Sequence, residues 1–181
     1  MLDKLLELDG NILLWIQDNI RCDILTPVMK GITYLGNGGI VMIAMCLIFL
    51  LIPKLRRLGI VCSGSLAATF LINNLMLKNI IARTRPYEVV DGLQRMIGAQ
   101  SDYSFPSGHS GAAFAVCMVI FFECPKKYGI PALVLAVLIA LSRLYVGVHY
   151  PSDVIAGALI GTLFAFIACK VYHHVTDKEI Y

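Results

Sequence analysis

Long runs of apolar residues, joined by short polar connections, dominate the chain from residue 26 onward. Residues 31–53 and 58–77 contain no charged side chain, and residues 103–122 contain none apart from His109. A helix needs about 20 mostly apolar residues to cross a bilayer, with a range of roughly 17–25. The pattern predicts five membrane-crossing helices, at residues 26–52, 57–80, 107–123, 129–147 and 151–173.

The first 22 residues differ, because acidic side chains interrupt their apolar positions. Asp3, Glu7, Asp9 and Asp18 disfavour a full span, and the basic start and cleavage site of a signal peptide are missing. We expect an amphipathic helix in the membrane interface, anchored by Trp15, or alternatively the first helix of the bundle. The predicted fold class is all-α: an integral membrane helical bundle of five to six transmembrane helices, in a single domain over residues 1–181.

Glycines predict two local features of this bundle. The sequence GNGG at 36–39 is expected to break or kink the first span, since glycine and asparagine weaken a helix interior. Gly157 and Gly161 are spaced for close contact between helices, and we expect this contact to be internal packing rather than dimerisation.

Composition supports the membrane assignment. The chain is 58% hydrophobic and 15% charged, whereas soluble domains are about 45–50% apolar and about 25% charged. Soluble, disordered and fibrous classes are therefore excluded. The formal charge of +3 is too small to indicate a nucleic-acid partner. The six cysteines follow no metal-binding spacing and lie mostly in apolar runs, which favours buried, reduced thiols.

Ionisable residues at the ends of membrane helices are costly and therefore functional candidates. In an alternating bundle, the exits of the second and fourth spans and the entries of the third and fifth share one face. Seven polar side chains from four predicted helices would meet there: Lys78, Arg85, Ser107, His109, Arg143, His149 and Asp153.

This set of residues suits phosphate chemistry. Three cations exceed the one nearby acid, Asp153, and guanidinium groups match phosphate oxygens in a bidentate way. Gly108 lets the backbone at a helix N-terminus approach an anion closely. Two histidines can supply a nucleophile and an acid. Asp153, four residues after His149, can accept from one ring nitrogen and leave the other free.

Three motifs then identify a family. Lys78-(six residues)-Arg85-Pro86, Pro106-Ser107-Gly108-His109, and Ser142-Arg143-(five residues)-His149-(three residues)-Asp153 resemble the signature of the type 2 phosphatidic acid phosphatase superfamily. They occur in the family's order within residues 78–153, and every polar position of the pattern is present.

The resemblance implies a role for each of these residues. His149 resembles the nucleophile that forms a phosphohistidine, with Asp153 orienting it, and His109 resembles the general acid and base. The resemblance also implies catalysis without a metal or other cofactor. The phosphate-binding positions of the family correspond to Lys78, Arg85, Ser107, Gly108 and Arg143.

The expected substrate is a lipid phosphate or diphosphate taken from the surrounding membrane lipids. Small bacterial members that this chain resembles act on polyprenyl diphosphates such as undecaprenyl diphosphate, which is the favoured reading, or on phosphatidylglycerol phosphate and phosphatidate. A transporter that holds an anion or lipid in the same pocket is a further alternative, although it would not need a nucleophile and an acid. Sequence does not choose among these lipids or indicate an oligomeric state.

Basic residues predict which side of the cell membrane carries the site. One face of the bundle would carry seven of them and the catalytic face eight. Three of the eight belong to the motifs and Lys30 falls within the first predicted span, which leaves four, so the positive-inside tendency favours an extracytoplasmic site. We expect two of the four, Arg83 and Arg95, to be solvated or to face headgroups, with a part in catalysis as the less favoured alternative. The seven are Lys54, Arg56, Arg57, Lys126, Lys127, Lys170 and Lys178.

Overall fold

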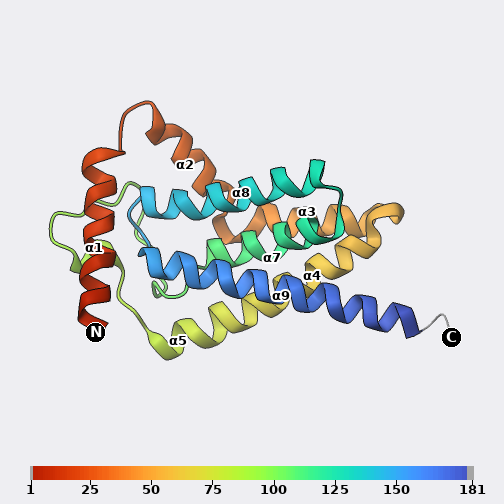
Figure 1. Cartoon of the computed structure of the whole chain (residues 1–181). Helices are drawn as coiled ribbons and strands as arrows, with labels where there is room; N and C mark the ends of the chain where they lie inside the picture. Colours follow the sequence, from red (N-terminus) through yellow and green to blue (C-terminus); the bar gives the residue numbers. More distant parts are fainter. Residues whose placement is uncertain (1, 179–181) are drawn as a thin grey trace.

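A computed structural model describes residues 2–178, and this part of the chain contains helices and no β-strand (Figure 1). The predicted single domain also includes residues 1 and 179–181, which lie outside the described residues. In chain order, the helices are α1 (Leu2–Asn19), α2 (Leu25–Leu35), η1 (Asn37–Gly39), α3 (Ile40–Leu51), η2 (Pro53–Leu55), α4 (Arg56–Phe70), the π-helical η3 (Leu71–Leu77), α5 (Lys78–Ile81), α6 (Pro86–Val89), α7 (Gly108–Glu123), α8 (Lys126–Tyr145) and α9 (Pro151–Lys178).

Three segments of residues 2–178 are long and apolar enough to cross a membrane by themselves: Pro53–Val89, Lys126–Tyr145 and Pro151–Thr176. A fourth consists of α2 and the segment Asn37–Leu51, which meet at an angle of 44°. Gly38 and Gly39 adopt φ values of 58° and 66° at this bend, a backbone region that favours glycine. The predicted kink in the first span is therefore confirmed.

Helix α7 lies at the centre of the bundle, where it packs against α4, α8 and α9. It is apolar around its circumference and buried along most of its 16 residues, as expected for a helix surrounded by others. Gly157 and Gly161 of α9 face its backbone: a Cβ atom on Gly161 would lie 2.9 Å from the nitrogen of Ala115. The predicted internal packing of these glycines is confirmed.

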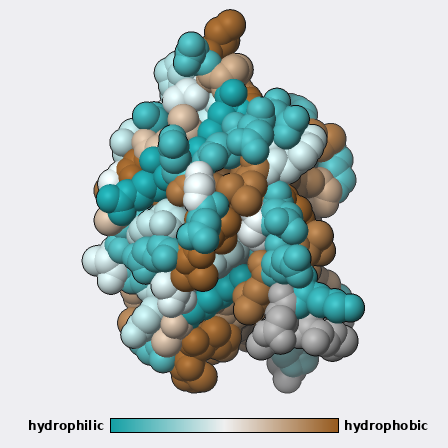
Figure 2. Space-filling model, turned by 90° about the vertical axis from the view of Figure 1, so that its left-hand side faces the viewer, coloured by the Kyte–Doolittle hydropathy of each residue, from teal (hydrophilic) through white to brown (hydrophobic). Residues whose placement is uncertain are grey.

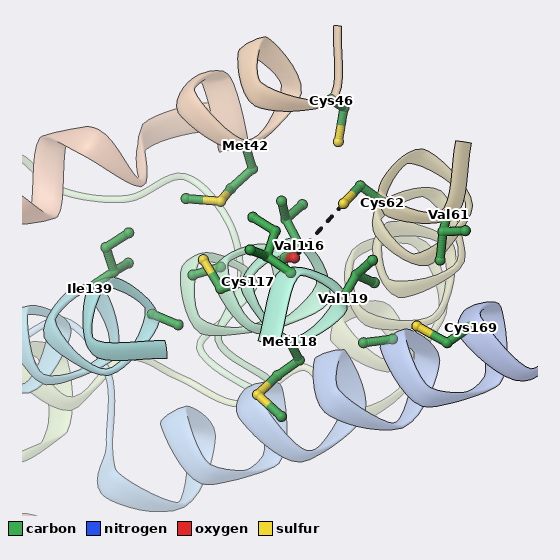
Figure 3. Close-up of a cluster of buried hydrophobic side chains, with 14 residues drawn as sticks. Met42, Cys46, Val61, Cys62, Val116, Cys117, Met118, Val119, Ile139 and Cys169 are labelled. Carbon is green, nitrogen blue, oxygen red and sulfur yellow. Dashed lines mark hydrogen bonds between the residues drawn. The ribbon is translucent and has the colours of Figure 1, made fainter. Parts of the chain in front are cut away.

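The main hydrophobic core joins α3, α4, α8 and α9 to the central α7 (Figure 3). Four of the six cysteines are buried in it as free thiols: Cys46, Cys62, Cys117 and Cys169. The expectation of burial is wrong for Cys22, which is exposed, and Cys124 is half-buried. The buried thiols behave as small apolar groups that fill space between helices.

Helix α1 lies across one end of the bundle rather than alongside the other helices (Figure 1). It contacts α8 and α9. Leu13 is fully buried and Asp9 is nearly so, whereas Leu5, Leu8 and Trp15 are exposed. A crosswise helix with exposed apolar side chains suits the membrane interface, which favours the amphipathic alternative.

Candidate active site

The predicted site residues gather at the end of the bundle that α1 crosses. Lys78 begins α5, Ser107 caps α7, Arg143 lies in the last turn of α8, and Asp153 lies in the first turn of α9. Figure 2 looks at this end of the molecule, where hydrophilic residues cover most of the surface among scattered apolar ones. The alternation of the helices thus places the three motifs together.

A cavity of about 720 Å³ opens among these elements. Its polar lining includes five of the predicted residues: Lys78, Arg85, Gly108, His109 and His149. The apolar part of the lining comes mostly from α3 and α4, including Ile43, Leu47, Leu66 and Phe70. Ser107, Arg143 and Asp153 do not line the cavity and lie behind it, fully buried.

Two of the predicted cations meet an acid that the motifs do not contain. The side chain of Asp102, 49% exposed, accepts hydrogen bonds from Nζ of Lys78 and, at 2.5 Å, from Nη2 of Arg85. Partial burial acts to raise the pKa of Asp102, but the hydrogen bonds and charges of Lys78 and Arg85 lower it below its ordinary value. The motifs predict Asp153 as the one acid near the three cations, so the carboxylate of Asp102 reduces the predicted excess of positive charge.

His149 is 1% exposed and directs one ring nitrogen toward Arg85. Nη1 of Arg85 lies 3.2 Å from Nε2 of His149, and because arginine can only donate, Nε2 accepts and carries no proton. Burial, with the positive charges of Arg85, Arg143 and Lys78, lowers the pKa of His149 well below its ordinary value. The imidazole is therefore neutral at pH 7, with its proton on Nδ1.

Asp153 lies beside His149, as the spacing predicts, although the contact is longer than a good hydrogen bond. The distance from Nδ1 of His149 to Oδ2 of Asp153 is 3.5 Å. Oδ2 instead accepts from the hydroxyl of Ser104 and, at 3.0 Å, from the backbone N–H of Tyr150. The carboxylate is thus fixed by other groups and faces the Nδ1 proton.

His109 contacts the kinked first span. Nε2 of His109 lies 3.1 Å from Oδ1 of Asn37, which can only accept a hydrogen bond. Gly36, one residue earlier, packs against the ring: a Cβ atom there would lie 2.6 Å from Cδ2 of His109. The GNGG break therefore shapes the wall around this histidine and orients its imidazole.

Arg143 and Ser107 support the cavity from behind. Nη1 of Arg143 donates to the hydroxyl of Thr33 at 2.9 Å, and Nη2 lies 3.5 Å from Oε1 of Gln100. The Ser107 side chain caps α7 by accepting from the N–H of Ser110. Gly108 and His109, in the first turn of α7, carry backbone N–H groups that the helix leaves unpaired, a setting that favours anions.

The expectation that Arg83 is solvated or faces headgroups is wrong. Its side chain is 15% exposed and forms ion pairs with Asp9 and Asp153. No local pattern in the sequence indicates these pairs, since Asp153 lies on a distant helix and Asp9 reaches Arg83 only because α1 crosses the end of the bundle. Arg95, in contrast, is exposed and lies over the ring of Tyr87, with 5.0 Å from Cζ to the ring centroid.

Comparison with known proteins identifies the family. Residues 57–177 match the family model of the PAP2 superfamily. The chain belongs to the PAP2 superfamily. The three motifs predicted this membership, and the match extends over the helices that carry all of them.

Individual relatives share a moderate part of the sequence. The chain is 31% identical to an undecaprenyl-diphosphatase of Sulfolobus acidocaldarius over 74% of its own length and 64% of that protein. It is 32% identical to phosphatidylglycerophosphatase B of Bacillus subtilis over 82% and 75% of the two chains. The crystal structure of a PAP2-type phosphatidylglycerolphosphate phosphatase from Bacillus subtilis superposes with a TM-score of 0.76, at 29% identity, covering 98% of this chain and 88% of that one.

Proposed function

We propose that this protein is a membrane lipid phosphatase that works through a covalent phosphohistidine on His149. The observation that carries the proposal is the position of His149, whose unprotonated Nε2 borders the cavity and is held by Arg85. A neutral imidazole whose Nε2 carries no proton is a competent nucleophile toward phosphorus once Arg85 turns from Nε2 to the substrate phosphate. An anion or lipid transporter, the alternative reading, would not need this arrangement.

The proposed reaction has two steps, formation of the phosphohistidine and its hydrolysis. Nε2 of His149 attacks the terminal phosphorus, and the bond from that phosphorus to the leaving oxygen breaks while protonated His109 gives its proton to that oxygen. The leaving oxygen is the bridging oxygen of a lipid diphosphate or the ester oxygen of a lipid monophosphate. Water then attacks the phosphohistidine while His109 takes its proton. The P–N bond breaks, releasing phosphate and restoring neutral His149.

The cations stabilise the phosphoryl group during transfer. Lys78 and Arg85 border the cavity, and the first-turn N–H groups of α7 open onto it, so donors already lie where negative charge develops. Arg143 adds positive charge from behind. Because these groups supply the charge that magnesium gives in other phosphoryl-transfer sites, we propose that the reaction needs no metal.

The substrate we favour is a polyprenyl diphosphate such as undecaprenyl diphosphate. The apolar part of the cavity, on α3 and α4, suits a lipid chain whose phosphate reaches the cations. A second cavity of about 570 Å³ borders the same Lys78 and Arg85, which leaves room for a second phosphate. A relative is named for undecaprenyl diphosphate, and another for phosphatidylglycerophosphate, which is the alternative substrate together with phosphatidate.

We further propose that α7 is a fifth membrane span, so that α2–α3, α4–α5, α7, α8 and α9 alternate across the cell membrane. At 16 residues α7 is short, but its position inside the bundle shields it from lipid. With five spans the site lies on the face opposite the larger group of basic residues, the extracytoplasmic face.

The proposal is tested by phosphate release from a panel of lipid phosphates and by trapping the intermediate. Rapid quench under alkaline conditions should recover radiolabelled phosphohistidine from the wild type and from His109→Ala, but not from His149→Ala. His109→Ala should lose about 10²–10⁴-fold in rate on lipids and less on an aryl phosphate, whose leaving group needs no proton. His174→Ala, an exposed histidine at the far end of α9, is the matched control. Label on His149→Ala would contradict the assignment.

A further inference from the structure

Both terminal nitrogens of Arg83 are hydrogen-bonded, although the residue belongs to none of the predicted phosphate-binding or catalytic positions. Nη1 donates to Oδ1 of Asp153 at 2.6 Å and to the hydroxyl of Ser152 at 2.7 Å. Nη2 donates to Oδ2 of Asp9 at 2.9 Å. The guanidinium also covers the ring of Tyr150, with 3.7 Å between Cζ and the ring centroid. Arg83 thus joins α1 to the first turn of α9.

Asp9 completes this connection from the side of α1. It is 3% exposed, and a carboxylate so buried is costly unless it is paired and hydrogen-bonded. Oδ1 accepts from the backbone N–H of Ser152 at 3.1 Å, and Oδ2 accepts from the Ser152 hydroxyl as well as from Arg83. Both oxygens are therefore used to hold the residue before Asp153 and the arginine that binds Asp153.

The contacts of Asp153 divide between its two oxygens. Oδ2, which faces Nδ1 of His149, accepts from Ser104 and from the N–H of Tyr150. Arg83 is the side chain that holds Oδ1. If Arg83 were removed, the buried Oδ1 would lose this hydrogen bond, which is costly for a charged oxygen. The carboxylate would then tend to rotate away from His149.

We propose that Arg83 is a positioning residue for the phosphatase reaction, acting through Asp153 on the orientation of His149, and that Asp9 holds Arg83 so that α1 forms part of the catalytic scaffold. The inference rests on the proposed function, since His149 must be the nucleophile. Misplacement of a reacting group by about 1 Å can reduce a rate about 10²-fold. Arg83 borders the second cavity and not the main one. The test therefore uses a lipid monophosphate, whose single phosphate binds in the main cavity, and on this substrate we expect the effect on kcat rather than on KM.

The test compares Arg83→Ala, Arg83→Lys and Asp9→Asn with the wild type in detergent micelles, with Arg95→Ala as the matched control. We expect Arg83→Ala to lose about 10²-fold in kcat with little change in KM, and Asp9→Asn to lose less. Low concentrations of guanidinium should partly restore Arg83→Ala, whereas ammonium should not. Arg95→Ala removes an exposed arginine on the next connection, between α6 and α7, and should behave as the wild type.

A double variant distinguishes positioning from general stabilisation. If Arg83 acts through Asp153, then Arg83→Ala should cost little further activity in an Asp153→Asn background, because effects within one unit are not additive. Arg83→Lys keeps the charge and supplies the comparison if Arg83→Ala does not fold, and it should also lose kcat, since an ammonium cannot bridge Asp9 and Asp153 as the fork does.

Two failures are distinguishable. If the wild type releases phosphate while Arg83→Ala and Arg83→Lys keep its kcat, or if the losses with Asp153→Asn simply multiply, the positioning role is overturned and the proposed function stands. If the wild type releases no phosphate from any lipid of the panel, the proposed function fails, and the positioning role fails with it.

Discussion

Oδ1 of Asn37 lies 3.1 Å from Nε2 of His109, so the break in the first span also holds the residue we propose as general acid. Asn37 is part of the GNGG sequence that bends α2 against α3. An acid must keep its ring aligned with the leaving oxygen, and this contact restricts the rotation of the ring. A glycine-rich kink that bends the helix therefore also places a polar side chain in the site.

Asn37→Ala should lower kcat for lipid substrates about tenfold, less than the 10²–10⁴-fold expected for loss of the whole acid. The loss should shrink for an aryl phosphate, whose leaving group departs without protonation. Steady-state rates on the two substrates measure this. Asn19→Ala, which removes an exposed asparagine bonded within α1, is the control. An equal loss on both substrates would mean that Asn37 serves another purpose.

The carboxylate of Asp102 pairs with Lys78 and Arg85 beside the cavity, where a substrate phosphate would compete with it. Asp102→Asn should therefore lower KM for lipid phosphates by about twofold to fivefold, since an exposed ion pair contributes up to about 1 kcal/mol. Titration of the initial rate with substrate gives KM, and Asp91→Asn, at an exposed turn of the same connection, is the control. A higher KM would instead make Asp102 a necessary support of the two cations.

Activity should persist in the presence of a chelator and should not rise on addition of magnesium. The positive charges of Lys78, Arg85 and Arg143, with the N–H groups that begin α7, stabilise the phosphoryl group directly. Phosphate release in EDTA, compared with release after magnesium is restored, measures this. Complete loss in chelator that magnesium reverses would show that the cations alone do not suffice.

A single cysteine at Gln94, in a cysteine-free background, should react with a membrane-impermeant thiol reagent in intact cells. Gln94 is exposed on the α6–α7 connection, and its hydrogen bonds to Gln17 and Arg21 use backbone atoms, which the substitution keeps. Labelling only after the membrane is broken would place the catalytic face in the cytoplasm. That result would also weaken the preference for a carrier-lipid diphosphate.

Much of the architecture follows from local patterns in the sequence. Apolar runs of span length predict the long helices, because a helix satisfies its own backbone hydrogen bonds inside lipid. The GNGG sequence predicts the bend, because Gly38 and Gly39 can adopt a backbone conformation that other residues disfavour. The motif residues meet because alternating helices return their polar ends to one face. This reasoning needs only the order and length of the helices.

Only the tertiary structure shows how the motif residues are held. Arg83 lies 74 residues from Asp9, and Asn37 lies 72 residues from His109, so no local pattern connects these pairs. Asp9 reaches Arg83 because α1 crosses the end of the bundle, and Asn37 reaches His109 because the bend between α2 and α3 packs against α7. In the same way, the connection after α6 brings Asp102 to Lys78 and Arg85. Sequence alone assigns the charge of Arg83 to solvent, but in the fold α1 covers it. The arginine is stable there because α1 also supplies Asp9, and a buried ionic group is stable only beside its counter-charge.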